Sequence, residues 1–375
     1  MSIFISSGEA SGDHYAAKLA QSLRASGYSG DIWGMGGIES RSAGLRAEWH
    51  GERLQLLGFT EVLSAIPSIF ALRNDMVKRI METSPKAVIV VDSPDYHMRL
   101  IAKLRRCGFT GRIFYVSPPA VWAWRSGRAE DLKANVDECL PLFKFEHDYL
   151  KSRGCRSFWT GYPLLEEFSR DAMELQKPPR ILAEDDKLVA FLPGSRASEV
   201  NSLLPMMEET ACKLKNRGWH PVFSVAPGLN PKVRNILLER FESDGTDYYE
   251  GPGRDLMAAA RCAVGASGTI TVESLLLGCY MIVTYKVNPI SAMLARMIIN
   301  TEHFAMANIL AGSEIFPEFL QHRATCGNVL TGALKWLEGD GDFASSVKAE
   351  MAKARATLGL PGVYKNWTDR ILEAV

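Results

Sequence analysis

The chain has 375 residues, of which 47% are hydrophobic and 23% are charged, and no tract of biased composition interrupts it. A chain of this length exceeds one ordinary core, so two domains of roughly 150–200 residues each are expected. Lys plus Arg equals Asp plus Glu, 43 against 43, which argues against wholesale electrostatic capture of nucleic acid. No apolar run reaches the ~20 residues that cross a bilayer, and the start lacks the pattern of a signal peptide.

The cysteines and histidines predict neither disulfides nor a metal cage. There are seven of each, and they show no CxxC, HxxxH or HExxH spacing. We therefore expect reduced thiols in a cytosolic setting, with no protein-built metal site.

Short β-rich runs alternate with helical patterns along the whole chain. The expected strands are residues 3–6, 87–91, 112–116, 157–159, 188–192, 221–225, 262–264 and 281–285. Their apolar residues do not alternate with polar ones, as expected of strands buried on both faces of a parallel sheet. The alternation of strand and helix predicts right-handed βαβ units, and so an α/β fold of two doubly wound, Rossmann-like domains facing a cleft.

The expected domain boundaries follow from composition. Residues 1–172 form the N-terminal domain, and residues 173–187, rich in Pro, Lys, Glu and Asp, form a linker. Residues 188–342 form the C-terminal domain. The tail, residues 343–375, is expected to be helical and either to cross back onto the N-terminal domain or to pack on a partner.

A loop of small residues follows the first expected strand. Residues 5–13 read Ile-Ser-Ser-Gly-Glu-Ala-Ser-Gly-Asp and precede a helix. Small residues let backbone N–H groups approach a bound oxygen, and a helix N-terminus favours negative charge. The pattern is not GxGxxG, so a nicotinamide cofactor is not indicated. A plain strand-to-helix turn, with Asp13 in the first helical turn, is an equal alternative.

Carboxylates follow the apolar strand at residues 87–91. Asp92 stands one step beyond it, at the edge where open α/β sheets bind ligands, and can act as a general base on an acceptor hydroxyl. Asp95 can serve the same role, and Asp95 or His97 can instead bond sugar hydroxyls. For Asp95 the favoured alternative is a helix cap, which leaves Asp92 as the catalytic candidate.

Three further segments offer groups for a sugar nucleotide. Trp122, Trp124 and Arg125 can stack on and pair with a ligand, although burial in a core or between domains is the favoured alternative. Ser195 and Arg196 stand in a turn before a helix, which suits a diphosphate. The remaining candidates follow the next expected strand of that half: Ser267, Gly268 and Thr269 for phosphate, and Glu273 for a ribose.

Two apolar stripes at helical spacing are candidates for contact with acyl chains or a membrane. One contains Val62, Ile66, Ile69 and Phe70, with arginines and lysine nearby, and the other spans residues 289–299. Taken as patterns alone, both are better explained by core or dimer packing.

In order along the chain, these segments resemble the lipid-A-disaccharide synthase family of GT-B glycosyltransferases. The resemblance covers nearly the whole chain and rests on blocks of sequence at suitable separations. They are GEASGD (8–13), GFTEVL (58–63), DSPDYH (92–97), YVSPPAVWAWR (115–125), LPGSR (192–196), ASGTITVES (266–274), ANILAG (307–312) and PEFLQ (317–321). Several ordered blocks are far more specific than any one of them.

The resemblance implies a reaction and its partners. The donor is UDP-2,3-diacylglucosamine, the acceptor is 2,3-diacylglucosamine 1-phosphate, and the product is a β-1′,6-linked lipid A disaccharide phosphate, formed with inversion. Such enzymes act in the cytosol at the inner face of the cytoplasmic membrane and need no metal, so no cofactor is expected. The two apolar stripes are then expected to contact the membrane or the acyl chains of the substrates. A homodimer is left open.

The resemblance also assigns roles to residues. Asp92 becomes the general base, and Glu9 and Ser11 line the acceptor side. On the donor side, Ser195 and Arg196 hold the diphosphate, and Asn308 lies near the donor. Ser267, Gly268 and Thr269 contact phosphate, and Glu273 contacts the ribose.

The chain departs from the family pattern in three places. Tyr162 stands where the family typically has His, which puts in doubt any role of that imidazole. Met306 and Ala307 replace the usual Leu-Pro before Asn308, and Tyr96 replaces the commoner Phe. Rival interpretations are a sugar-nucleotide epimerase, which needs no acceptor, and a non-catalytic UDP-sugar or lipid-binding scaffold.

Overall fold

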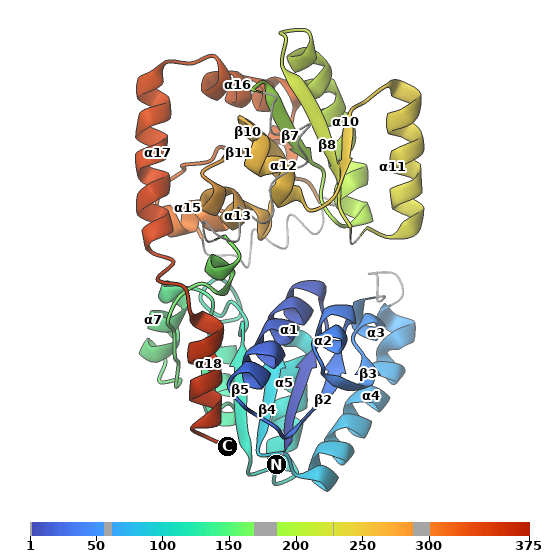
Figure 1. Ribbon diagram of the computed structural model, residues 1–375, viewed down its shortest axis with the longest axis vertical. Helices are drawn as coiled ribbons and strands as arrows, with labels where there is room; N and C mark the ends of the chain where they lie inside the picture. Colours follow the sequence, from blue (N-terminus) through green and yellow to red (C-terminus); the bar gives the residue numbers. More distant parts are fainter. Residues whose placement is uncertain (1, 56–61, 169–185, 228, 288–300) are drawn as a thin grey trace. The chain divides into compact units, whose positions relative to one another are not determined.

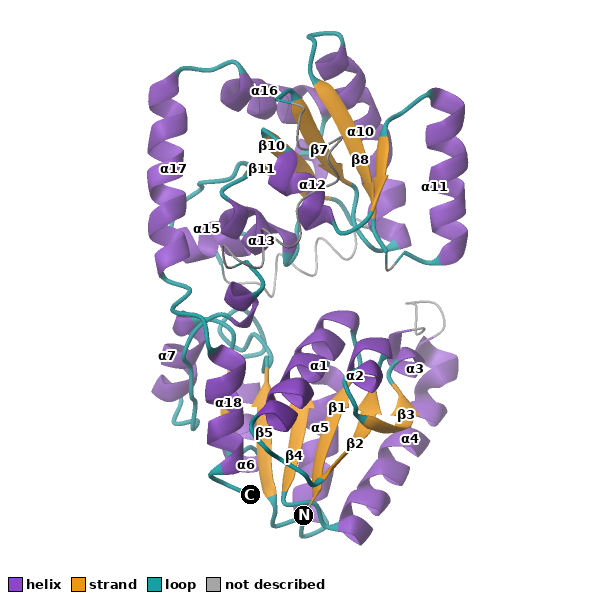
Figure 2. Ribbon diagram, in the orientation of Figure 1, coloured by secondary structure: helices purple, strands orange, loops and turns teal. Residues whose placement is uncertain are grey.

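The computed structural model describes residues 2–55, 62–168, 186–227, 229–287 and 301–375. The chain divides into two compact units (Figure 1). Unit 1 contains residues 1–166 and 358–375, and unit 2 contains residues 167–357. The first boundary thus lies at 166/167, and the expected linker at 173–187 falls almost wholly outside the described residues. Each unit has a parallel sheet with helices on both faces, as Figure 2 shows.

Unit 1 is built on a six-stranded parallel sheet in the order β3-β2-β1-β4-β5-β6. Its strands are β1 (Ser2–Ser7), β2 (Asp31–Gly36), β3 (Arg46–His50), β4 (Ala87–Val91), β5 (Arg112–Val116) and β6 (Glu138–Leu140). Its helices are α1 (Ala10–Ala25), α2 (Ile38–Ser42), α3 (Glu52–Gln55), α4 (Val62–Thr83), α5 (Pro94–Arg106), α6 (Arg128–Asn135), α7 (Lys144–Ser152), η1 (Pro163–Glu166) and α18 (Val363–Leu372). The central strands β1 and β4 are almost entirely buried, as their unbroken apolar runs predict.

Unit 2 repeats this design with the strand order β12-β11-β10-β7-β8-β9. Its strands are β7 (Leu188–Leu192), β8 (His220–Val225), β9 (Tyr248–Glu250), β10 (Cys262–Ala266), β11 (Tyr280–Tyr285) and β12 (Glu318–Leu320). Its helices are α10 (Ala197–Lys215), α11 (Pro231–Asp244), α12 (Gly253–Ala259), α13 (Ile270–Leu277), α15 (Met306–Ala311), η2 (Gln321–Arg323), α16 (Cys326–Leu337) and α17 (Gly341–Ala356).

Both sheets have the same topology. The first strand of each unit, β1 or β7, lies between the second strand and the fourth, and the order reverses at that point. In such a sheet the crevice at the carboxyl ends of the two central strands is the preferred ligand site. The structure therefore singles out one edge in each unit, after β1 and β4 and after β7 and β10.

The strands that sequence analysis missed are interrupted by glycine or lie toward the sheet edges. In β2, Gly34 has a φ of +147°, and a Cβ there would lie 2.0 Å from the Ile5 carbonyl oxygen on the neighbouring β1. Only glycine permits this approach, and the same residue breaks the apolar run that would have predicted a strand. The strand expected at residues 157–159 is instead a single bridge between Ser157 and Cys139.

The C-terminal helix α18 belongs to unit 1. Trp367 is fully buried, Thr368 donates a 2.8 Å hydrogen bond to Ser22 of α1, and Arg370 pairs with Glu138 of β6 at 2.7 Å. Helix α17 remains in unit 2, so the tail divides at 357/358 and its two helices belong to different units.

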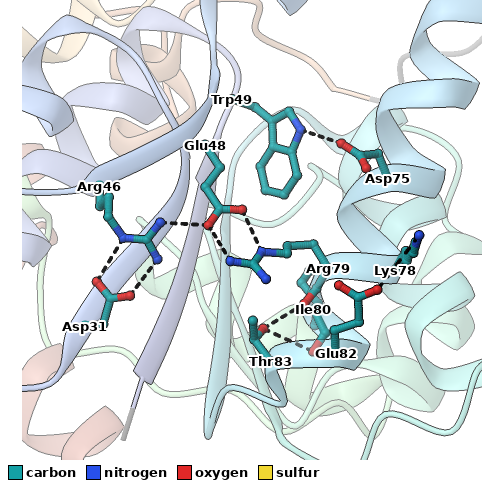
Figure 3. Close-up of polar contacts among 10 residues, drawn as sticks. All are labelled: Asp31, Arg46, Glu48, Trp49, Asp75, Lys78, Arg79, Ile80, Glu82 and Thr83. Carbon is teal, nitrogen blue, oxygen red and sulfur yellow. Dashed lines mark hydrogen bonds and ion pairs between the residues drawn. The ribbon is translucent and has the colours of Figure 1, made fainter.

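A network of ion pairs joins β2, β3 and α4 in unit 1, as Figure 3 shows. Arg46 pairs with Asp31 and with Glu48, each at 2.7 Å, and the Arg79 Nε lies 3.0 Å from Glu48. The Trp49 indole also donates to Asp75 at 2.9 Å. Since Asp75 and Arg79 are on α4, these contacts hold that helix against β3.

Candidate active site

Asp92 lies at the carboxyl end of β4 in a left-handed backbone conformation. Its φ is +55° and that of Ser93 is +46°, which is uncommon for residues other than glycine. The Asp92 carbonyl oxygen accepts hydrogen bonds from Tyr115 Oη at 3.0 Å and from His97 Nδ1 at 2.7 Å. Such conformations cost roughly 1–3 kcal/mol each and persist only where neighbours impose them. Here Tyr115 and His97 hold the turn that presents the Asp92 carboxyl group.

His97 lies in the protein interior and contacts the Asp92 turn rather than a ligand. It is fully buried, and burial lowers its pKa to about 4, so the ring is neutral near pH 7. Because the Asp92 carbonyl can only accept, Nδ1 carries the proton, and Nε2 then accepts from Ser6 Oγ at 2.8 Å. The alternative in which His97 bonds sugar hydroxyls is thus wrong, and His97 is a positioning residue.

The Asp92 carboxyl group has the properties of a general base. Burial raises its pKa to about 6, and the nearby Glu9 carboxylate contributes to the rise. Ser11 Oγ donates to Oδ2 at 3.3 Å, which opposes the shift. A base with a pKa just below neutrality is ionised at pH 7 yet holds a proton well. Glu9, Ser11 and Asp92 are therefore brought together at this edge of the sheet.

Small residues allow the loop after β1 to approach Asp92. A Cβ on Gly12 would lie 3.4 Å from the Asp92 Cβ, and one on Gly8 would lie 2.8 Å from Ser93 Oγ. Ser93 is buried, and within the described part of the chain its hydroxyl has no hydrogen-bond partner. Ser93 is not among the predicted site residues, although it directly follows Asp92 in the sequence.

Other acidic residues near this edge serve the fold. Asp13 is buried and accepts from the Gly37 and Glu39 amides at 2.6 and 2.9 Å, so it fixes the start of α2. Asp95 forms ion pairs with Arg128 and, at 3.3 Å, with Arg125. No side-chain cap was found at the start of α5, so the favoured capping role of Asp95 was wrong.

The tryptophans after β5 divide between two roles. Trp122 is half-buried and donates to Glu146 at 3.0 Å, and burial raises the pKa of Glu146 to about 7. Trp124 has the guanidinium of Arg125 over its ring at 4.4 Å. Trp122 thus packs within unit 1, whereas Trp124 and Arg125 form a stacked pair.

In unit 2 the turn with Ser195 and Arg196 and the turn of residues 267–269 follow adjacent strands, β7 and β10. Leu192 and Gly265 are paired between β7 and β10, so the turns that follow these strands meet at one edge. The side chains of Ser195 and Arg196 are exposed there. Their backbone amides, however, donate to the Glu199 carboxylate at 3.2 and 3.4 Å. These amides are therefore occupied, and Arg196 Nη1 also pairs with Glu199 Oε1 at 3.2 Å, although the Arg196 side chain is 70% exposed. This turn offers a ligand the Ser195 hydroxyl and the remaining donors of the Arg196 guanidinium.

Two of the three amides in the turn before α13 remain open. Ser267 N donates to Thr284 O at 3.0 Å, whereas Gly268 N and Thr269 N donate no hydrogen bond within the described residues, and both residues are exposed. Glu273 is half-buried one turn into the helix. Of the two turns, this one therefore offers a bound anion more free backbone N–H donors.

Asn308 does not fit its expected role near the donor. It is fully buried, and its Nδ2 donates to Phe316 O and Glu318 Oε1, both at 2.8 Å. Its Oδ1 accepts from Phe316 N at 2.9 Å. The amide is used within the protein, so Asn308 stabilises the loop that joins α15 to β12.

The apolar stripes are only partly described. Ile69 packs against the core of unit 1, and Phe70 is 44% exposed. The side chains of Val62 and Ile66, and residues 289–299 as a whole, lie outside the description. Tyr162, which replaces the family's His, is buried and stacked on Phe143 with ring centroids 5.1 Å apart.

No group of three or more His, Cys, Asp or Glu side chains among the described residues is placed to hold a metal ion. In the described parts of the chain, no helix is long and apolar enough to cross a membrane.

Comparison with known proteins decides the family. The family profile described as lipid-A-disaccharide synthetase matches residues 3–360. The chain is 33% identical over 374 residues to the lipid-A-disaccharide synthase of Anaeromyxobacter dehalogenans (strain 2CP-C), covering 99% of this chain and 96% of the relative. It is 32% identical over 381 residues to that of Myxococcus xanthus (strain DK1622), covering 99% and 97%. The chain belongs to the lipid-A-disaccharide synthase family. It is thus a glycosyltransferase of lipid A biosynthesis, as the ordered sequence blocks predicted.

Solved structures place this member of the synthase family in the GT-B fold. A putative UDP-N-acetylglucosamine 2-epimerase from Listeria monocytogenes aligns with a TM-score of 0.65 and 14% identity, covering 100% of this chain and 95% of that one. The glycotransferase of kitacinnamycin aligns with a TM-score of 0.62 and 14% identity, covering 100% of this chain and 99% of that one. At such identities the likeness concerns the fold alone. The predicted pair of Rossmann-like domains is confirmed.

Proposed function

We propose that the chain transfers 2,3-diacylglucosamine from UDP to the 6-hydroxyl of 2,3-diacylglucosamine 1-phosphate. The products are UDP and the β-1′,6-linked disaccharide 1-phosphate, formed with inversion. The observation that carries this proposal is the Asp92 carboxyl group, held on a strained turn at the reversal point of the first sheet with a pKa of about 6. The family membership supplies the substrate class.

The reaction is a direct displacement. The acceptor oxygen attacks the anomeric carbon of the donor as its bond to the UDP oxygen breaks, and the hydroxyl proton passes to Asp92. Glu9 and Ser11 line the acceptor side, where Ser11 already contacts Asp92. Single displacement inverts the anomeric centre, so an α-linked donor gives a β-linked product.

UDP binds to unit 2 and leaves as an anion. Arg196 and Ser195 contact the diphosphate through their exposed side chains, and the open amides of Gly268 and Thr269 supply further donors. Ser267 lies beside these amides, and Glu273 bonds the ribose. Charge-assisted hydrogen bonds of this kind stabilise the leaving group most as its charge develops.

The remaining proposals concern setting and assembly. The acyl chains of both substrates require contact with the inner face of the cytoplasmic membrane, and the exposed Phe70 supports such contact. The transfer needs neither a metal ion nor another cofactor, since Arg196 and the α13 turn meet the diphosphate charge. A homodimer is compatible with this scheme.

The test is an assay of purified protein with UDP-2,3-diacylglucosamine, with and without the acylated sugar 1-phosphate, in excess EDTA. Release of UDP that depends on the acceptor, together with a disaccharide lipid, is the expected result. Conversion of the UDP-sugar without acceptor would instead establish an epimerase. Activity that EDTA abolishes and Mg²⁺ restores would remove the metal-independent scheme.

A further inference from the structure

A cavity of about 410 Å³ lies over α5 in unit 1, between α4 and α6. Its wall contains four arginines from these three helices: Arg73, Arg99, Arg106 and Arg128. It contains only two carboxylates, Asp95 and Asp131. No step proposed above uses any of these groups.

The charges of this cavity are only partly neutralised by the protein. Asp95 is already paired with Arg128 and Arg125. Within the described residues, Arg73, Arg99 and Arg106 form no ion pair with a carboxylate, and two guanidinium atoms, Arg73 Nε and Arg128 Nη1, have no hydrogen-bond partner. Planar guanidinium groups with unused donors favour phosphate and carboxylate ligands. The cavity is therefore suited to an anion.

Apolar groups line the same cavity beside the charges. Phe70 is exposed, and the Arg73 guanidinium lies over its ring at 4.5 Å. Met98 and Ala102 of α5 also contribute to the wall. A ligand that matches this lining has a negatively charged group attached to an apolar body.

The position of the cavity relates it to the active site. Pro94 and Asp95 line it, and they follow Asp92 by only two and three residues. The α4 wall is held by its contacts with β3, in which Arg79 pairs with Glu48 and Asp75 accepts from Trp49 (Figure 3). The cavity thus adjoins α5, the helix that begins two residues after Asp92.

We propose that this arginine cavity binds the phosphate group of the acylated glucosamine phosphate acceptor. The inference rests on the proposed function and deepens it, because it identifies the part of unit 1 that distinguishes a phosphorylated acceptor from the unphosphorylated glycolipid. Arg73 and Arg99 contact the phosphate, and Phe70 lies against an acyl chain. The anionic headgroups of membrane phospholipids offer related chemistry, and the experiment separates the two sources.

The experiment compares the variants Arg73→Ala, Arg99→Ala and their double with Lys103→Ala. Lys103 is the matched control, since it is a cation one turn beyond Arg99 on α5 but does not line the cavity. We expect the double variant to raise the KM for the phosphorylated acceptor about 10- to 100-fold, the range for loss of charged hydrogen bonds. The KM for the UDP-sugar and the rate with acceptor that lacks phosphate should not change.

Two binding measurements do not depend on turnover. The first is sedimentation of the protein with micelles that contain the acylated glucosamine 1-phosphate or its unphosphorylated form. If the wild type forms no disaccharide but binds the phosphorylated lipid through these arginines, the proposed reaction fails and the site stands. The second is flotation with phosphatidylglycerol or phosphatidylcholine vesicles. Loss of phosphatidylglycerol binding with an unchanged acceptor KM would assign the arginines to the membrane and overturn the proposal, as would equal effects on both acceptors.

Discussion

Replacement of Asp92 by asparagine should abolish most activity and at the same time stabilise unit 1. The side chain keeps its size and can still accept from Ser11, but it cannot take a proton. General-base catalysis contributes typically 10²–10⁴-fold, so kcat should fall by that factor. The folded protein raises the pKa of Asp92 from its ordinary 3.8 to about 6, which means that the ionised carboxylate is disfavoured by folding.

The magnitude of the stabilisation follows from that pKa. A difference of about two pH units corresponds to ~3 kcal/mol, and partial exposure of the side chain reduces this to ~1.5–3 kcal/mol. The wild-type penalty begins to appear above pH 3.8 and is complete above pH 6. The gain should therefore be full at pH 8 and about half as large at pH 5, with a rise in Tm of roughly 3–10 °C for a unit of this size at pH 8.

Thermal denaturation of wild type and Asp92→Asn at pH 5 and pH 8, beside disaccharide formation, tests both halves of the argument. Asp95→Asn is the matched control, because Asp95 is exposed and ion-paired and its loss should not raise Tm. A variant that is inactive but no more stable at pH 8 would refute the view that burial sets the properties of Asp92. Wild-type turnover by the variant would refute its role as base.

Four further predictions test other parts of the molecule. First, kcat/KM of the wild type should rise with pH through an apparent pKa near 6, since Asp92 must be ionised and His97 is neutral throughout this range. A flat profile from pH 5 to 8 would exclude Asp92 as the base. Second, His97→Leu should lower kcat about 10- to 100-fold without changing the KM for the UDP-sugar. His97→Asn, whose amide can replace the Nδ1 donor, should keep most of the wild-type kcat. Equal kcat values for the two variants would refute the positioning role. Third, Arg196→Ala should weaken UDP binding by ~1.5–3 kcal/mol in calorimetric titration, whereas Arg217→Ala, at an exposed pair elsewhere in unit 2, should leave the affinity unchanged. Fourth, Gly34→Ala should lower Tm by several degrees at least, because its Cβ meets the Ile5 carbonyl, while Gly44→Ala, with open space around it, should cost only ~1 kcal/mol from its φ; equal melting temperatures would contradict the packing argument.

Much of the central fold could be predicted because buried parallel strands have unbroken apolar runs. β4, β5 and β7 lie where these runs placed them, and β8, β10 and β11 differ by only one or two residues. The edge strands β9 and β12 have three residues each and no such run. Their pairing depends on tertiary neighbours, which a single segment does not encode.

For the site, the sequence motifs indicated which segments contribute residues, but not which partner each polar atom contacts. Asp92 and Ser11 meet because the strands that precede them, β4 and β1, are neighbours in the folded sheet. Asn308 and Glu199 show the opposite case, since their hydrogen-bond capacity is taken up by the protein itself. Which partner satisfies a buried group depends on distances between segments, so it emerges only in the folded chain.

The return of residues 358–375 to unit 1 bears on how the chain acquires its structure during synthesis. Trp367 is fully buried, and Arg370 pairs with Glu138, so a surface formed by residues 1–166 stays uncovered until residues 358–375 are made. Unit 2, although second in the sequence, has all of its residues by position 357. The order of completion is thus reversed relative to the usual N-terminal-first order. The N-terminal segment must wait for residues 358–375 while about 190 further residues are translated, which takes on the order of 10–40 s at typical rates of synthesis.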